Sequence, residues 1–194
     1  PRKSGFGARI SYVTYSGDEL TLYGVAVDVE ADITTSFGLN YTYLFNNYSS
    51  LEFSIDYINT DAQFEALGYS LTMGELTQIP VLLTLRLHPA ASTKAKPYLG
   101  VGLGYYLNNL DTDSTNAALV YGSGAEIDVD DSFGFHVNGG VEFFIAENYS
   151  FNLDLKYILN KADADVNISS FTAEEMSMDA VVVGVGLKYY YWGS

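Results

Sequence analysis

Large apolar residues and small or polar residues alternate along much of this chain with a period of two. Over residues 36–43, for example, Phe, Leu and Tyr occupy the odd positions and Ser, Gly, Asn and Thr the even ones. Successive side chains of a strand point to opposite faces, so each such segment has one oily and one small, polar face. The oily face is too large for a water-soluble sheet. This pattern is typical of a sheet with lipid outside and water inside.

The alternation recurs in eight segments, and each is long enough to cross a bilayer, which takes about 9–11 residues of tilted strand. Aromatic and β-branched residues, which favour strands, dominate them. No stretch approaches the roughly 18 apolar residues of a membrane helix. The eight predicted strands are residues 5–15, 33–45, 50–59, 76–88, 97–108, 131–145, 149–159 and 179–191.

The connections between these segments alternate between short and long. Such alternation marks an outer-membrane barrel, with short periplasmic turns and long extracellular loops. Closure into a barrel removes the unpaired edges that lipid does not tolerate. The sequence therefore predicts an all-β fold: an eight-stranded antiparallel transmembrane β-barrel. We expect one domain over residues 1–192, with residues 193–194 a remnant of cloning.

Charge is distributed unevenly between the two kinds of connection. The net charge is −15, and most of the 24 acidic residues fall in the long connections 16–32, 60–75, 109–130 and 160–178. An acidic surface excludes nucleic acid as a partner. The acidic loops either bind divalent cations shared with lipopolysaccharide or form a solvated surface. The chain has no Cys and no recognisable catalytic constellation, so we expect no enzyme, no metal site and no cofactor.

The inward register collects charged residues near the short turns. Arg or Lys facing lipid at mid-bilayer costs about 2–4 kcal/mol, so these side chains are assigned to the lumen. Mixed signs in a lumen that side chains can fill suggest an ion-paired plug. The alternative is a network that only stabilises the barrel. The plug residues are Arg9, Glu52, Asp56, Arg86, Glu142, Asp154, Lys156 and Lys188, with His88 among them.

Nearer the long loops, the inward positions are apolar. An apolar upper lumen suits a hydrophobic solute, although the same residues could simply pack against one another. The predicted upper-lumen residues are Val13, Ile58, Leu82, Tyr106, Ile158 and Val182.

Pro80 stands within the fourth predicted strand, near its outer end. Proline cannot donate a ladder hydrogen bond and is confined to edges, bulges and strand starts. We therefore predict locally broken pairing with the third or fifth strand. Such a gap could serve as a lateral opening to the bilayer, or it could be a simple bulge.

The order and spacing of several segments resemble the OmpW family of small outer-membrane barrels, which includes AlkL-like channels for hydrophobic compounds. The resemblance is strongest over strands four to eight and moderate over strand two. The aromatic end, residues 186–192, looks like the signal read by the outer-membrane assembly machinery. The motifs that carry the resemblance are QIPVLLTLR (78–86), KPYLGVGLGY (96–105), DSFGF (131–135), GGVEF (139–143) and NLDLKY (152–157).

The resemblance implies a bacterial outer-membrane protein with a hydrophobic upper channel that passes small apolar molecules. We expect a monomer in contact with outer-membrane lipid and lipopolysaccharide. The leading hypothesis is passive, non-enzymatic uptake of small hydrophobic solutes. Two alternatives remain. One is a structural or adhesive barrel with an inert lumen, whose loops bind cations, surfaces or phage. The other is a soluble, lipocalin-like barrel with its apolar face inside.

Overall fold

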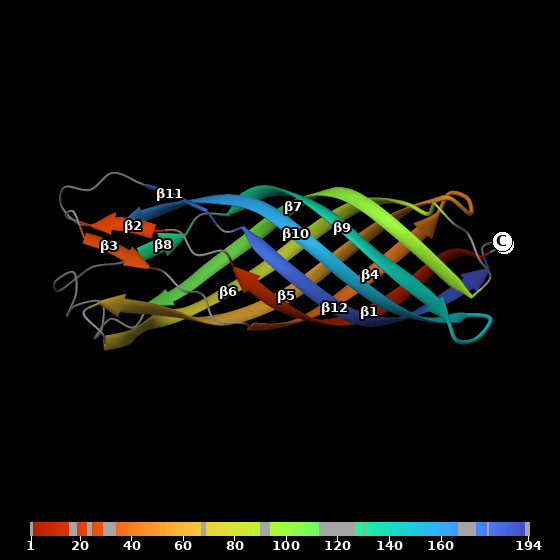
Figure 1. Ribbon diagram of the computed structural model, residues 1–194, viewed down its shortest axis with the longest axis horizontal. Helices are drawn as coiled ribbons and strands as arrows, with labels where there is room; N and C mark the ends of the chain where they lie inside the picture. The colour runs from red at the N-terminus through yellow and green to blue at the C-terminus, as the bar shows by residue number, and fades with distance from the viewer. Residues whose placement is uncertain are drawn as a thin grey trace.

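The computed structural model describes residues 2–15, 19–22, 25–28, 34–66, 69–89, 94–112, 127–129, 131–166, 174–177 and 179–192. Eight long antiparallel strands form a closed barrel (Figure 1). Every barrel strand pairs with its neighbours in the chain, and the ring closes where the last strand meets the first. Within these residues, no helix has the length and apolarity of a membrane span. The predicted fold class is confirmed.

The barrel strands follow one another around the ring in chain order. Four shorter strands lie in the long connections: β2 (Glu19–Leu22), β3 (Val25–Asp28), β8 (Ile127–Val129) and β11 (Glu174–Ser177). The barrel strands are β1 (Arg2–Tyr15), β4 (Thr34–Leu44), β5 (Ser49–Ala66), β6 (Tyr69–Leu87), β7 (Ala95–Thr112), β9 (Ser132–Phe144), β10 (Tyr149–Val166) and β12 (Ala180–Trp192).

The two ends of the barrel differ, as the alternation of connections predicts. At the turn end, tight turns join β4 to β5 and β9 to β10. The Phe45 amide donates to the Ser49 carbonyl at 3.1 Å, and the Ile145 amide to the Tyr149 carbonyl at 3.0 Å. The C-terminus lies at this end, whereas the four short strands gather at the opposite, loop end (Figure 1).

Several strands extend further toward the loop end than the sequence predicts. Residues 60–75, expected to form a long loop, are mostly paired strand. The β5–β6 ladder continues to the Ala66–Tyr69 pair, with a bulge at Ala62/Gln63. β7 and β10 likewise run on to Thr112 and Val166. Main-chain pairing needs no apolar alternation beyond the lipid, so polar residues can continue the ladder. Residues 193–194 lie outside the described part of the chain.

The barrel carries its large apolar side chains on the outside, as the alternation predicts. Phe6, Leu39, Leu99 and Phe133 are between 59% and 77% exposed, while their strand neighbours point inward and are mostly buried. Exposed apolar residues occur on all eight barrel strands. Such an apolar surface suits contact with the hydrocarbon of a bilayer, because exposing it to water would be unfavourable.

Candidate functional site

The inward side chains nearest the loop end form a compact apolar layer. It contains all six residues predicted for the upper lumen, together with Ala180, and Tyr15 packs against it. Each of the seven is at most 7% exposed. We call this set the apolar layer: Val13, Ile58, Leu82, Tyr106, Ile158, Ala180 and Val182.

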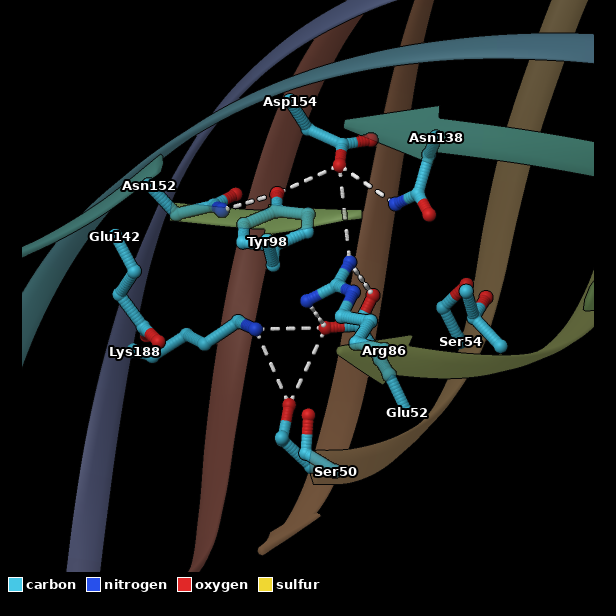
Figure 2. A network of polar contacts seen from close by, with 12 residues as sticks. Ser50, Glu52, Ser54, Arg86, Tyr98, Asn138, Glu142, Asn152, Asp154 and Lys188 are labelled. Atoms are coloured by element: carbon cyan, nitrogen blue, oxygen red, sulfur yellow. Dashed lines mark hydrogen bonds and ion pairs between the residues drawn. The ribbon is translucent and has the colours of Figure 1, made fainter. Parts of the chain in front are cut away.

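On the turn side of the apolar layer, charged side chains cross the lumen and pair. Glu52 is the centre of the network (Figure 2). It receives Arg86 through both guanidinium terminal nitrogens at 2.5 Å and the Lys188 ammonium at 2.6 Å. Thr42 donates to the same carboxylate at 3.2 Å. The pairing compensates these buried charges for the water they have lost, because an unpaired charge in the lumen would be poorly solvated.

Arg9 and Asp154 complete the network. Arg9 Nη2 donates to both oxygens of Asp56, at 2.8 and 2.6 Å, and Nη1 lies 3.9 Å from Glu52 and from Asp154. Asp154 also lies 3.8 Å from Arg86. All of these side chains are at most 5% exposed. We call this set the ionic layer: Arg9, Glu52, Asp56, Arg86, Asp154, Lys156 and Lys188.

Glycines make room for the ion pairs that reach across an intervening strand. Gly38 of β4 pairs with Arg9 of β1 on one side and Asp56 of β5 on the other. A Cβ on Gly38 would collide with the Asp56 carboxylate. Gly100 of β7 likewise lies between Arg86 and Asn138, and its Cβ would meet both. Charged side chains two strands apart therefore meet over a strand that has no side chain there.

Tyr98 belongs to the network but was not predicted to. Its hydroxyl donates to Asp154 at 2.6 Å and accepts from Asn152 at 2.7 Å (Figure 2). The Arg86 guanidinium carbon lies 4.3 Å from its ring centroid, as in a cation–π contact. The alternation contained the signal, because Leu99 is 66% exposed on the outer face of β7, so its neighbour Tyr98 points inward.

Glu142 and His88 lie in the lumen but bond to other partners. Glu142 accepts from Ser150 at 2.5 Å and from the Tyr190 hydroxyl at 2.8 Å. The His88 Nε2 atom lies 2.9 Å from the Ser50 hydroxyl. Both are buried. Glu142 therefore lies beside the ionic layer, bonded to two hydroxyl groups.

Pro80 points into the lumen and is fully buried. It pairs with Tyr106 of β7 in continuous register. On the β5 side, the pairs Ile55–Val81 and Ile58–Gln78 share one register, but the two positions between them, Pro80 and Ile79, are unpaired. The β5–β6 ladder is therefore interrupted at Pro80, as expected for a residue without an amide hydrogen.

The lumen is suited to bind some solutes and to exclude others. The apolar layer can surround a hydrocarbon chain, whereas a solute in the ionic layer would have to replace the ion pairs that it separates. Among the described residues, no group of three His, Cys, Asp or Glu side chains is arranged to hold a metal ion. The structure describes the backbone of many acidic residues in the long connections but almost none of their side chains, so the expected cation binding remains a prediction.

Three comparisons place this chain among known proteins. The OmpW family model matches residues 8–191. The chain is 24% identical over 156 residues to the uncharacterized outer-membrane protein y4mB of Sinorhizobium fredii, a match covering 79% of this chain and 64% of that protein. It thus spans less than two thirds of y4mB. It is 22% identical over 192 residues to outer membrane protein AlkL of Ectopseudomonas oleovorans, covering 91% and 77%.

The fold also matches solved outer-membrane barrels. The crystal structure of OprG from Pseudomonas aeruginosa superposes with a TM-score of 0.75 at 22% identity, covering 99% of this chain and 98% of OprG. The solid-state NMR structure of AlkL in DMPC lipid bilayers superposes with a TM-score of 0.66 at 18% identity, covering 100% and 92%. These matches show that the chain shares the barrel fold of these proteins.

Proposed function

This chain belongs to the OmpW family and is an integral outer-membrane β-barrel, and from that premise we propose that it is a passive channel for small hydrophobic molecules. Solutes enter at the loop end, bind in the apolar layer and leave sideways through the barrel wall. No enzymatic step is involved. The observation that carries the proposal is the division of one lumen into an apolar and an ionic layer.

Partition into the apolar layer supplies the driving force. Each methylene group removed from water contributes about 0.8 kcal/mol. An eight-carbon solute would therefore gain on the order of 6 kcal/mol before the cost of displacing the packed side chains. The layer is closed in this structure, so Leu82, Ile158 and their neighbours must move aside when a solute enters.

The ionic layer blocks straight passage toward the turn end. A hydrocarbon there would separate buried ion pairs such as Arg86–Glu52 without replacing them, and breaking a buried pair typically costs about 3–5 kcal/mol. A sideways exit avoids that cost. The interrupted ladder at Pro80 supports an exit between β5 and β6, because the wall is least tied there and Pro80 borders Leu82 of the apolar layer.

The channel proposal is tested by placing a charge in the apolar layer. In cells expressing the protein, we expect entry of the apolar dye N-phenylnaphthylamine to exceed that of cells with an empty vector. Leu82→Asp or Ile158→Asp should reduce the excess at least tenfold. Leu82→Met, which conserves volume and polarity, is the matched control and should keep it. Folding of each variant is checked by heat-modifiable migration on gels, and unchanged entry in the folded Asp variants would refute the channel.

The lateral exit is tested separately with Pro80→Val, which restores an amide hydrogen facing β5. We expect slower dye entry without loss of binding, since the wall is then tied at that position. If Pro80→Val leaves entry intact, the exit lies elsewhere and the rest of the channel proposal stands.

A structural or adhesive barrel with an inert lumen is the second candidate. The observation that favours it is the tight packing of both layers, whose residues are nearly all less than 8% exposed. It predicts no dye entry above the empty-vector level and no conductance in planar bilayers. Its acidic loops would then carry the function, through divalent cations shared with lipopolysaccharide or contacts with other surfaces.

A further inference from the structure

The charges of the ionic layer do not pair one to one. It holds the cations Arg9, Arg86, Lys156 and Lys188 and the carboxylates Glu52, Asp56 and Asp154, while the fourth buried carboxylate, Glu142, lies beside it and accepts from Ser150 and Tyr190. Three of the cations have close partners: Arg9 on Asp56, and Arg86 and Lys188 on Glu52. Lys156 is the exception.

Lys156 is 2% exposed, and among the described residues no carboxylate forms an ion pair with its ammonium within 4.0 Å. Asp56, Asp154 and Glu52 attract it from further away, and Arg9 repels it. A buried cation without a close counter-ion is poorly solvated. A ligand that brought an anion to this point would supply that counter-ion.

Lys156 lies at the boundary between the two layers. Its β12 partner is Val182, which pairs in turn with Val13, and the next inward residue along β10 is Ile158. All three belong to the apolar layer. The Asp154 carboxylate lies one inward position toward the turn end. The backbone of Lys156 therefore lies at the floor of the apolar layer, and its side chain starts from there.

Two other buried polar atoms near this boundary lack hydrogen-bond partners. They are Nδ1 of His136, whose strand position pairs with Ile158, and the Tyr106 hydroxyl. The Tyr106 ring lies against Gly104 and Gly134, next to Asn160 of β10. The other His136 nitrogen, Nε2, lies 2.8 Å from the Thr84 hydroxyl. When Nε2 accepts from Thr84, Nδ1 carries the proton and is a donor, as the Tyr106 hydroxyl is.

We propose that the boundary binds the carboxylate of a small amphiphile, with Lys156 as its counter-ion and the apolar layer around its tail. This proposal rests on the proposed function and narrows its solute class. A plain hydrocarbon would leave the Lys156 ammonium unpaired, and a small anion would leave the apolar layer unused. A medium-chain monocarboxylate would pair with the ammonium through its carboxylate and occupy the apolar layer with its tail.

The test uses the whole protein in lipid nanodiscs at pH 7, where a carboxylic acid is ionised and a lysine ammonium is protonated. Radiolabelled decanoate, decan-1-ol and acetate are dialysed against loaded and empty discs, and the difference gives binding to the protein. We expect decanoate to bind at least tenfold more tightly than decan-1-ol, because only decanoate brings a negative charge that can pair with the Lys156 ammonium. Acetate should bind far more weakly than either.

Lys156→Met and Lys156→Gln should each reduce the ratio of decanoate to decan-1-ol affinity at least tenfold. Two variants are used so that a folding defect in one leaves the other to decide. Lys94→Met is the matched control, because Lys94 is an exposed lysine at the turn end, and its ratio should match that of the unmodified protein.

The outcomes separate this inference from the channel proposal. If decan-1-ol binds but decanoate binds no more tightly, or if folded Lys156 variants keep the ratio, the carboxylate site is refuted and the channel stands. If acetate binds as well as decanoate, the site takes small anions and the amphiphile is wrong. If neither ten-carbon ligand binds above empty discs, the hydrophobic channel itself fails.

Discussion

The apolar layer and the ionic layer are built on the same strands with the same alternation, but their side chains are held in different ways. In the apolar layer, Leu82, Tyr106 and their neighbours are held by non-directional packing. In the ionic layer, Arg86 and Lys188 converge on the Glu52 carboxylate in fixed geometry. Packing can rearrange around a guest molecule, whereas an ion pair must be broken. This difference supports the proposed roles, in which the apolar layer admits solutes and the ionic layer stops them.

Removing the centre of the ionic layer should have the largest effect on the barrel. Glu52→Gln leaves Arg86 and Lys188 buried without their shared carboxylate, and we expect a loss of about 3–5 kcal/mol of unfolding free energy. Urea unfolding of the protein folded into lipid vesicles measures it. Glu147→Gln, at an exposed turn position, is the control and should change stability by less than about 0.5 kcal/mol. Equal stability of both variants would mean that the ion pairs do not hold the lumen together.

Creating space in the apolar layer should cost less and should also alter transport. Leu82→Ala removes a side chain that is 1% exposed, and we expect a loss of about 2–4 kcal/mol in the same unfolding measurement. Leu83→Ala, on the lipid side of the same strand, should cost less because lipid fills the space it leaves. If dye entry through Leu82→Ala does not rise above the unmodified level, packing in this layer does not limit entry.

Lys156→Met compares a residue without a close counter-ion with Glu52, which has two. Because its ammonium lacks a close partner, replacing it with an apolar side chain should leave stability unchanged or raise it by about 1–2 kcal/mol. The expected sign is thus opposite to that of Glu52→Gln. Thermal unfolding followed by loss of heat-modifiable migration reports it, and a destabilisation as large as that of Glu52→Gln would show that Lys156 is paired in solution.

Pro80→Val should have the smallest effect. Restoring one ladder hydrogen bond between β5 and β6 contributes about 0.5–1.5 kcal/mol. Hydrogen exchange should show slower exchange of amides at 56–58 and 79–81, while those of β9 and β10 stay unchanged. Uniformly unchanged exchange would indicate that proline is not the cause of the interrupted pairing.

Much of the architecture could be predicted from the sequence, because strand periodicity is exact enough to assign faces. A shift of one residue would move every side chain to the opposite face, so Leu82 inward and Leu83 outward follow from the pattern alone. The same rule placed Arg9 and Glu52 inside. The rule also places Tyr98 and Ala180 inside, although neither carries a charge or a large aliphatic side chain that would mark it as part of either layer.

The strand ends were less predictable. Beyond the lipid, residues 60–66 lack the long apolar alternation of the membrane-spanning part, and Tyr69, Leu71 and Met73 alternate over too few residues to cross a bilayer, so the sequence suggested a loop. In the structure, the two strands continue to pair because each supplies main-chain partners for the other. Hydrogen bonding between backbones carries no side-chain signature.

By itself, the sequence determined the class of fold, the lipid-facing surface and the order of apolar and charged residues with depth, since all three depend on local alternation. Only the tertiary structure decided which charges meet. Arg9 reaches Asp56 over Gly38, and Arg86 and Lys188 share Glu52, because strand stagger and closure bring residues of different strands to one level. The same stagger leaves Lys156, at the floor of the apolar layer, without a close carboxylate. The pattern of β10 alone could not predict this, because the carboxylates Glu52 and Asp56 are on another strand.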